Sequence, residues 1–543
     1  KDGRYDYIET GSLLSLKRNT ENIILPSEEK HIQMYPLDFE EFLWALGDTT
    51  TIPFLKMCFD EKKPLGQALH RKVMNDFRQY ILVGGMPQAV NEYIATKDFA
   101  NVDEIKRDIL TLYRNDISKF AKGYENKETV ILQAHIDMVP VADSGIKHDF
   151  LKDPIIPVVK DDGFVYAKGT TLGADDGIGA CTALAILEDK ELNHGPLIAV
   201  FTVEEESTMK GALQIAPEVL QEGKYLINLD SEDDDFLFVS CAGSADINLK
   251  FASKRIEIED TKAFTVSLSG LKGGHSGTDI NKGRANAAEV LSAILLDVSD
   301  DTCDLFLADF TSGHVRNSIP STAKVIVKVP SGRVDAFVKA VKESFSFYRD
   351  FYKSTDPDMA LCVNETDCAK AFGLTDTQTF LSLIRALPLG PIRPWDINPE
   401  IVETSVNLGL VSSDDSGLCL CLMPRSLKES GLDDIIAKLS AFCSLIDNLE
   451  IEIDNRHPCW ESPSENSLIS CLKKNYKEIT GKDMIVTALH AGLECAMFAA
   501  KAPDLQLVSL GATINSPHSP FERVSIQGTQ NVYEAVKRTL SQL

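Results

Sequence analysis

Four short apolar segments of the chain each run into side chains that could bind a metal ion. These segments and the residues that follow them are 129–134 with His135 and Asp137, 197–203 with Glu204, Glu205 and Glu206, 225–229 with Asp230, and 505–511 with His518 beyond a short loop. Carboxylates and imidazoles are ligands that divalent transition metals take from proteins. Ligands collect beyond the carboxyl ends of strands in open α/β sheets, so we expect these side chains to converge.

A fifth group of acidic residues lies between glycines. Asp175 and Asp176 occur in the sequence GTTLGADDGIGA, at the entry to the apolar helical segment ACTALAILED. Backbone flanked by glycine can approach a site closely, and the start of a helix favours a carboxylate. One of the two aspartates is therefore a candidate for a ligand that bridges two metal ions.

The chemistry of such a cluster follows from its charge. Carboxylates and imidazoles crowded into one crevice would repel one another and lose hydration unless cations neutralised them. A pair of divalent metal ions meets this need, and a set of ligands without thiolates suits zinc, with manganese or cobalt as alternatives. Two metals roughly 3.5 to 4 Å apart can share a carboxylate and a water molecule, whose pKa falls from 15.7 toward about 7.

Two acidic residues are expected to assist the ligands. Asp137 is two residues from His135, on the same face of an extended segment, so its carboxylate can hold the second ring nitrogen. Of the adjacent glutamates, one would bind metal while another takes the proton from water. Each motif alone has a simpler interpretation, namely a structural hydrogen bond, a solvated helix start or a turn. The five groups together favour a metal site.

The pattern of apolar segments also indicates the elements that must position these residues. Short strands alternating with helical stretches indicate an α/β protein whose largely parallel sheet is covered on both faces. Between about 244 and 456, alternating segments such as AFTVSLSG and TAKVIVKV surround helical ones, which predicts an α+β insertion. An amphipathic helix over about 102–120 ends a first unit. The expected division is 1–121, 122–243, 244–456 and 457–543.

Composition narrows the classes of function. The formal net charge is −26, from 55 basic and 81 acidic residues, which argues against a nucleic-acid partner held by phosphate contacts. No apolar run approaches the 18 or so residues that span a bilayer, and no signal pattern opens the chain, so we expect a cytoplasmic protein without a membrane partner. The first residue is Lys1, as expected of a processed chain or a fragment.

Taken together, the motifs match a known family. The chain contains, in this order, HIDMV, TTLGADDGIG, EEES, NLDSE, GLKGGHSG, RNSIP, HAGLE and PHSP. This series resembles the di-zinc metallopeptidases of the aminoacylase and carboxypeptidase superfamily, most closely the bacterial aminoacyl-histidine dipeptidases. The resemblance spans about 122–543. It implies a zinc-peptidase-like, doubly wound mixed sheet with an inserted α+β lid domain.

The resemblance also implies roles for single residues. The implied metal ligands are His135 and Asp230 for one zinc ion, Glu206 and His518 for the other, and Asp175 as the bridge. Glu205 falls on the general base, and Asp137 on the residue that orients the metal-bound histidine.

Three residues of the lid match substrate-binding positions. His275 corresponds to a residue near the oxyanion, and Asn317 and Arg425 correspond to contacts with the carboxyl end of the substrate. A guanidinium makes paired bonds to a carboxylate, which agrees with the last of these roles. From the residues alone, a solvent-facing histidine in a glycine-rich turn and a surface ion pair are the favoured interpretations of His275 and Arg425.

The implied function is hydrolysis of dipeptides with a free C-terminus, above all Xaa-His dipeptides such as β-alanyl-histidine. A water activated by two zinc ions would attack, with Glu205 as general base. Two alternatives stay open, a related deacylase or aminopeptidase of the same superfamily and a non-catalytic binding module. The expected partner is a small peptide substrate, and a homodimer through the lid domain is a candidate assembly.

Residues 1–121 resemble a different class of protein. They contain YIETGSLLSLK, MYPLDFEEFLWAL and YILVGGMPQAVNEYI, which are similar to the rear part of a bacterial AAA-type ATPase with a mostly helical, winged-helix-like lid. No G-x-x-x-x-G-K-[ST] phosphate loop occurs in the chain, so this part is expected to lack a nucleotide site. It stands where the dipeptidase family has a helix and strands before the His-x-Asp strand.

Overall fold

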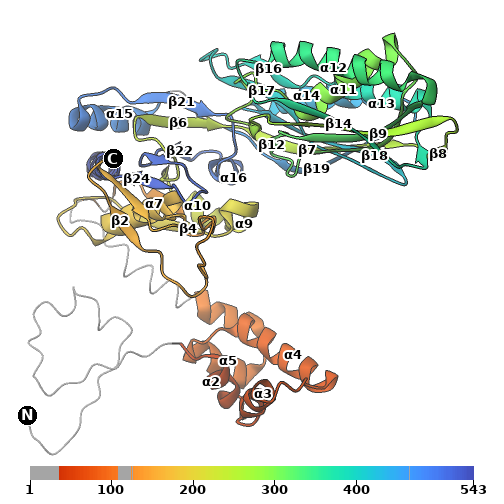
Figure 1. Ribbon diagram of the computed structural model, residues 1–543. Helices are drawn as coiled ribbons and strands as arrows, with labels where there is room; N and C mark the ends of the chain where they lie inside the picture. Colours follow the sequence, from red (N-terminus) through yellow and green to blue (C-terminus); the bar gives the residue numbers. More distant parts are fainter. Residues whose placement is uncertain (1–35, 108–123, 125, 464) are drawn as a thin grey trace, which may run out of the picture. The chain divides into compact units, whose positions relative to one another are not determined.

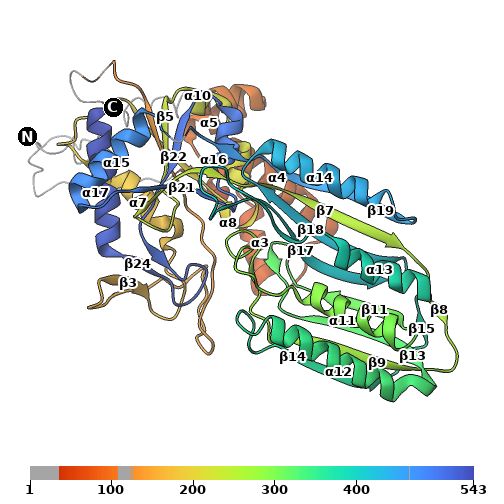
Figure 2. The same cartoon turned by 90° about the horizontal axis from the view of Figure 1, so that it is seen from above.

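A computed structural model describes residues 36–107, 124, 126–463 and 465–543, which Figure 1 and Figure 2 show from two sides. The chain divides into two units, residues 1–117 and 118–543. The predicted metal ligands all belong to the second unit.

The described part of the first unit, residues 36–107, is helical. Its helices include α2 (Phe39–Ala45), α3 (Thr51–Asp60), α4 (Gln67–Val83) and α5 (Pro87–Thr96). Residues 99–107 are also helical, as the predicted amphipathic helix requires, and the rest of that helix lies outside the described residues. The strands of a winged-helix-like unit do not occur within 36–107.

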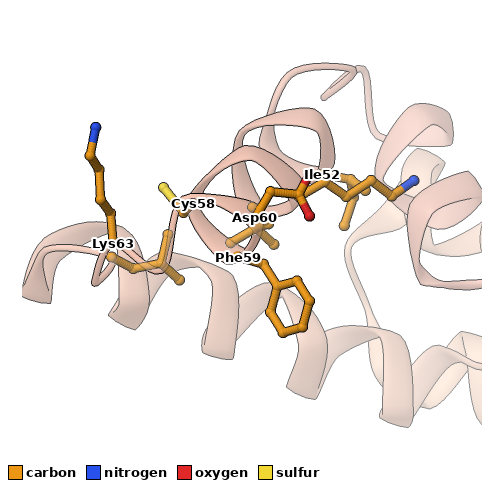
Figure 3. Close-up of a pocket in the computed structure, with 8 residues that line it drawn as sticks. Ile52, Cys58, Phe59, Asp60 and Lys63 are labelled. Atoms are coloured by element: carbon orange, nitrogen blue, oxygen red, sulfur yellow. The ribbon is translucent and has the colours of Figure 1, made fainter.

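Aromatic side chains form the centre of the first unit. Phe42 is fully buried, and its ring centroid lies 5.4 Å from that of Tyr80 and 6.4 Å from that of Tyr93. A surface hollow on α3 and the residues after it is lined by Ile52, Leu55, Lys56, Cys58, Phe59, Asp60, Lys63 and Leu65 (Figure 3). Phe59 remains 84% exposed. The hollow contains none of the predicted site residues.

Seven strands of the described second unit form a mixed sheet in the order β20-β6-β22-β5-β1-β4, with β21 also paired to β6. Their bounds are β1 (Val130–His135), β4 (Leu197–Thr202), β5 (Tyr225–Asn228), β6 (Phe236–Cys241), β20 (Trp460–Glu461), β21 (Ile485–Leu489) and β22 (Gln506–Ser509). β1 is parallel to both β4 and β5, and β5 is parallel to β22. The four strands predicted from the apolar segments are therefore neighbours. β6 is antiparallel to β20 and β22, which makes the sheet mixed.

Helices cover both faces of this sheet. Their bounds are α7 (Ala174–Glu188), α8 (Glu205–Thr208), α9 (Lys210–Gln214), α10 (Pro217–Gln221), α15 (Ser467–Thr480), α16 (Cys495–Lys501) and α17 (Ile526–Gln542). Successive side chains of a strand point to opposite faces. Val130 and Leu132 of β1 thus join the core with α7, α15 and α17, while Ile131 joins the core with α9, α10 and α16. Figure 2 shows α7, α15 and α17 on one side of the strands and α10 and α16 on the other, so the doubly wound prediction is confirmed.

Nine strands between residues 243 and 457 form the second large sheet of the described chain, in the order β14-β9-β13-β11-β17-β18-β7-β19, with β16 also paired to β17. Their bounds are β7 (Gly243–Ala252), β9 (Thr261–Ser269), β11 (Phe306–Ser312), β13 (Ala323–Pro330), β14 (Ala360–Thr366), β16 (Gly390–Pro394), β17 (Val402–Asp414), β18 (Gly417–Ser426) and β19 (Leu449–His457). The neighbouring pairs β11–β13, β13–β9, β17–β18, β18–β7 and β19–β7 are all antiparallel.

One face of the nine-stranded sheet carries the helices (Figure 1). They are α11 (Ala287–Asp301), α12 (Val334–Phe351), α13 (Leu374–Ala386) and α14 (Glu429–Cys443), with a 3-10 turn η1 (Ser331–Arg333) before α12. Their apolar side chains share a single core with the strands. The edge strand β14 alternates between partly buried and exposed side chains, as expected of a sheet with one solvated face. The inserted α+β fold is thus confirmed.

Short strands form three smaller sheets among the described residues. One contains β2 (Pro157–Val159), β3 (Phe164–Ala167), β24 (Arg523–Ser525) and β23 (Ile514–Asn515), another contains β10 (Gly274–His275) and β12 (Ser318–Ile319), and the third contains β8 (Ile256–Glu257) and β15 (Lys370–Ala371). None of the described helices combines the length and the apolar content that a membrane crossing requires.

Asn286 offers a test of how the inserted sheet holds its first helix. Its Oδ1 accepts the amides of Ala288 and Glu289 at 3.1 and 3.4 Å, and its Nδ2 donates to the carbonyl of Leu408 at 2.8 Å. Asn286→Ala should lower the free energy of unfolding by about 1 to 3 kcal/mol, because it removes the helix cap and leaves a buried carbonyl unpaired. Urea unfolding followed by circular dichroism measures the loss. Asn286→Ser keeps a capping oxygen and should lose less, and equal losses would contradict the cap.

Candidate metal centre

Four neighbouring strands end at the same edge of the mixed sheet. The register places His135 of β1 opposite Thr202 of β4, and Gln133 opposite Asn228 of β5. Asn228 in turn lies opposite Ser509 of β22. The predicted ligands lie at these strand ends or follow them, so the sheet delivers them to one edge.

The first group of ligand atoms is buried. His135 Nε2 lies 3.1 Å from Asp175 Oδ1 and 3.3 Å from Asp230 Oδ1. The three ligand atoms lie within 4.8 Å of one another. Side-chain exposure is 1% for His135, 10% for Asp175 and 7% for Asp230. This group can hold one metal ion away from bulk water.

The second group shares Asp175 with the first. His518 Nε2 lies 3.1 Å from Asp175 Oδ2 and 2.9 Å from Glu206 Oε2, and these atoms also fall within 4.8 Å of one another. Glu206 is 11% exposed, whereas the side chain of His518 is 48% exposed. Each oxygen of Asp175 therefore faces a different imidazole, which is the geometry of a bridging carboxylate.

Without metal, protons hold this charge cluster together. Hydrogen bonds to Asp175 and Glu206 raise the pKa of His518 to about 10. Burial opposes a charge on His135, yet its bonds to Asp175 and Asp230 raise the pKa of this imidazole above its usual range. Burial raises the pKa of Asp230 to about 7. Divalent cations could replace these protons, since metal ligands must be deprotonated.

The donor atoms fit a pair of divalent metal ions. They comprise imidazole nitrogens and carboxylate oxygens without a thiolate. Oε1 of Glu206 is buried and has no hydrogen-bond partner among the described residues. An unpaired buried carboxylate oxygen is costly unless a cation or donor meets it. The structure thus brings all five predicted ligands together.

Asp137 holds His135 in a way that differs from the predicted one. His135 Nδ1 donates to the backbone carbonyl of Asp137 at 3.0 Å, while the Asp137 carboxylate is 3.6 Å from that nitrogen. The carboxylate instead accepts the amides of Glu205 and Glu206, both at 3.2 Å. Asp137 therefore orients the histidine through its main chain and fixes the two glutamates through its side chain.

The three adjacent glutamates separate because the strand ends in a helical turn. Glu204 has a φ of 58° and pairs with Lys210 at 3.2 Å on the surface. Glu205 and Glu206 begin helix α8 and are only partly exposed. Burial, followed by the charge of Asp230, raises the pKa of Glu205 to about 9. Glu205 is thus a carboxyl group close to the predicted ligands that makes no ion pair of its own in the described chain.

His275 presents one ring nitrogen for a ligand. Its Nδ1 accepts the amides of Gly277 and Thr278 at 3.3 and 3.2 Å, which places the proton of the neutral ring on Nε2. Burial, and then the charge of Arg425, lowers the pKa of His275 to about 4, so the ring is neutral at neutral pH. Its Nε2–H is therefore available as a donor.

Asn317 lies next to His275 through the β10–β12 pair. His275 is paired with Ser318, and the backbone carbonyl of Asn317 accepts the amide of Ser276 at 2.9 Å. The side chain of Asn317 is exposed. An ion pair between the exposed Arg316 and the buried Asp246 anchors the loop that carries it.

Arg425 is a buried cation that forms no ion pair within the described residues, although the charge of Asp246 favours its protonated form. The residue is 6% exposed, and its guanidinium donates to Ser276 Oγ at 3.2 Å and to the Met423 sulfur at 3.3 Å. Burial lowers its pKa to about 10. No carboxylate of the described residues lies within ion-pair distance of Arg425. A buried guanidinium in this state favours a ligand that brings a carboxylate.

Several polar residues near the site were not singled out from the sequence. His490 of the HAGLE motif bonds through Nε2 to Ser405 Oγ at 2.7 Å. Burial, and then the charges of Arg425 and His275, lowers the pKa of His490 to about 3. His490 is thus a fourth imidazole near the site, besides those of His135, His275 and His518. Its position after the strand 485–489 is the same signal that identified His135.

A buried polar chain crosses the sheet behind the ligands. Gln133 donates to Glu494 at 2.6 Å and accepts from Asn228 at 2.6 Å, and Thr202 also donates to Glu494 at 2.6 Å. Burial raises the pKa of Glu494. Gln133 interrupts the apolar run of β1. A single polar residue in a buried strand needs hydrogen-bond partners, so Gln133 was the feature of the sequence that could have indicated this chain.

Residues 131–542 match the sequence family described as peptidase family M20/M25/M40. This chain belongs to that family, whose metallopeptidase character implies a divalent-metal site. The match covers the mixed sheet from β1 onward and the whole inserted sheet.

Two relatives support the more particular resemblance. The cytosol non-specific dipeptidase of Escherichia coli (strain K12) is 35% identical over 423 residues, which make up 78% of this chain and 86% of the relative. The crystal structure of aminoacylhistidine dipeptidase from Vibrio alginolyticus is 34% identical, with a TM-score of 0.69, and the match covers 78% of this chain and 87% of that chain. The resemblance predicted from the motifs is thus confirmed.

A further match spans the end of the first unit and the start of the second. Residues 74–136 match a domain of unknown function. The ATPase resemblance of residues 1–121 gains no support from these matches and stays a prediction.

The metal-free cluster predicts a pH-dependent affinity for divalent ions. His518 and Glu205, with pKa values of about 10 and about 9, carry protons at neutral pH that are lost or redistributed when metal binds. We expect the apparent affinity for Zn²⁺ or Mn²⁺ to rise between about pH 6 and about pH 8, with protons released to the buffer. Calorimetry in two buffers of different ionisation enthalpy measures both quantities.

The same pKa shifts determine whether the stability of the metal-free protein rises or falls with pH. Because both folded pKa values lie above the ordinary values of 6.5 and 4.5, the stability that these groups contribute is present at low pH and lost as pH rises toward about 9 and about 10. Added metal should remove this loss. An affinity that does not change with pH would contradict the protonated cluster.

Proposed function

We propose that this chain is a metal-dependent dipeptidase that hydrolyses dipeptides with a free C-terminal carboxylate, with Xaa-His dipeptides such as β-alanyl-histidine as its preferred class. The observation that carries the proposal is the pair of ligand groups joined through Asp175, with Glu205 beside them. The names of both relatives support the dipeptide substrate, and the name of the Vibrio alginolyticus relative supports the histidine preference. The name of the Escherichia coli relative also supports action in the cytoplasm.

The proposed ligands divide between two metal positions. His135 and Asp230 would hold one ion, Glu206 and His518 the other, and Asp175 both. Zinc suits this set best, with manganese or cobalt as alternatives. When bound, such a pair lowers the pKa of a shared water and polarises the scissile carbonyl.

Glu205 is the proposed general base. Its pKa of about 9 in the metal-free protein results from burial and from neighbouring carboxylates, whose charge the cations would offset. As a carboxylate, Glu205 would take a proton from the attacking water and pass it to the leaving amine. The Asp137 carboxylate supports this role, since it holds the amides of Glu205 and Glu206.

The inserted domain would supply the groups that bind the substrate. The Nε2–H of His275 would donate to the oxyanion, because its Nδ1 is already an acceptor for two amides. Arg425 would bind the C-terminal carboxylate, and Asn317 would contact the same end of the substrate. The buried, unpaired state of Arg425 favours a peptidase that recognises a free carboxylate over a deacylase that does not. Dimerisation through the inserted domain stays a prediction.

Replacing Glu205 tests the proposed base. Glu205→Ala should lower kcat for β-alanyl-histidine by about 10²- to 10⁴-fold, because no other group would accept the proton from water. The zinc content, measured by atomic emission, should not change. Glu204→Ala is the matched control and should keep its activity within about twofold, since Glu204 pairs with Lys210 on the surface. Normal turnover in Glu205→Ala would refute this role.

The carboxylate requirement can be tested with one substrate pair. Wild-type protein should cleave β-alanyl-histidine much faster than its C-terminal amide, with a ratio of about 10²-fold in kcat/KM. Arg425→Met should abolish most of this ratio by slowing only the free acid. Equal rates for acid and amide in the wild type would instead support a deacylase or aminopeptidase.

A further inference from the structure

Glu522 connects the loop of His518 to the start of helix α7. It lies four residues after His518, directly before β24, and is 2% exposed. Its carboxylate accepts four successive backbone amides. The donors are Leu172 at 2.7 Å and Gly173 at 3.0 Å to Oε2, and Ala174 at 2.7 Å and Asp175 at 3.3 Å to Oε1.

A carboxylate suits this place for two reasons. Buried backbone amides outside a regular helix need an acceptor, and a negative charge is favourable near the start of a helix. Two carboxylate oxygens also offer enough lone pairs for all four donors. No lysine, arginine or histidine of the described chain lies within ion-pair distance of Glu522, so these amides are its partners. A glutamine at this position would turn its own NH₂ group toward two of the four amides, which would then lose their acceptor.

The last of the four donors belongs to the residue that both ligand groups share. Asp175 reaches His135 through one oxygen and His518 through the other, each at 3.1 Å. A small rotation of its backbone would move one oxygen away from its group. Gly173 has a φ of 71°, and Asp175 and Asp176 also have non-helical backbone angles, so regular helix does not hold this stretch in place. The Glu522 carboxylate supplies that support.

We propose that Glu522 is a positioning residue of the metal centre. It holds residues 172–175 so that the two oxygens of Asp175 face separate metal positions, and it fixes the His518 loop to the same point. Glu522 itself touches neither position. This inference rests on the proposed function, because it requires that the two ligand groups bind metal.

The test measures metal affinity and needs no substrate. Metal-free protein is titrated with Zn²⁺ against a chromophoric chelator, and Glu522→Gln should weaken the apparent affinity by about 10- to 100-fold, as the loss of outer partners of metal ligands does. Asp356→Asn is the matched control. Asp356 is also fully buried and accepts the amides of Lys272 and Ala285 at 2.8 and 2.9 Å, but it lies in the inserted domain. Its variant should keep the wild-type affinity.

A second variant separates positioning from folding. Glu522→Asp keeps the charge but shortens the side chain, and it should bind Zn²⁺ with an affinity between those of wild type and Glu522→Gln. Circular dichroism of each metal-free variant reports the fold. Wild-type affinity in Glu522→Gln would overturn the inference, as would failure of both Glu522 variants to fold without metal. If the wild type binds no Zn²⁺, the proposed function fails, and the inference fails with it.

Discussion

The shared carboxylate of Asp175 is the interaction on which the rest of the site depends. One oxygen faces His135 and the other faces His518, which lies 343 residues after Asp175 in the chain. The sheet brings these segments to one edge because it places β1 beside β5, and β5 beside β22. The parallel register therefore determines the chemistry, because a shift of one residue would turn His135 to the other face.

Burying so many ionisable groups imposes a second constraint. Apolar side chains fill both faces of the mixed sheet, yet β1 carries Gln133 in its centre. That residue is tolerated because Glu494 and Asn228 satisfy its amide, in a chain of bonds that continues across neighbouring strands. The same burial raises the pKa values of Asp230 and Glu205. These carboxyl groups therefore hold protons more tightly than usual, and a bound cation can displace those protons.

Much of this arrangement was predictable from local sequence patterns. Apolar runs of strand length marked β1, β4, β5 and β22, and the side chains after them converge because parallel strands end together. The role of the Asp137 carboxylate was less predictable, since the helical turn of α8 redirects it to the amides of Glu205 and Glu206. His490 follows the strand 485–489 and carries the same signal as His135, whereas Glu522 gave a weak signal, because its importance lies in partners that are distant in sequence and no periodicity reports such contacts.

The bond between Arg425 and Ser276 has a consequence for substrate length. Ser276 directly follows His275, so the guanidinium that would meet a carboxylate is tied to the loop that carries the imidazole. In a dipeptide the distance from the scissile carbonyl to the terminal carboxylate is fixed by one residue. In the proposed dipeptidase, the two groups would therefore select the length of the substrate. A peptide longer by one residue would bind its carboxylate at the guanidinium and miss the imidazole, or reach the imidazole and leave the guanidinium without a partner.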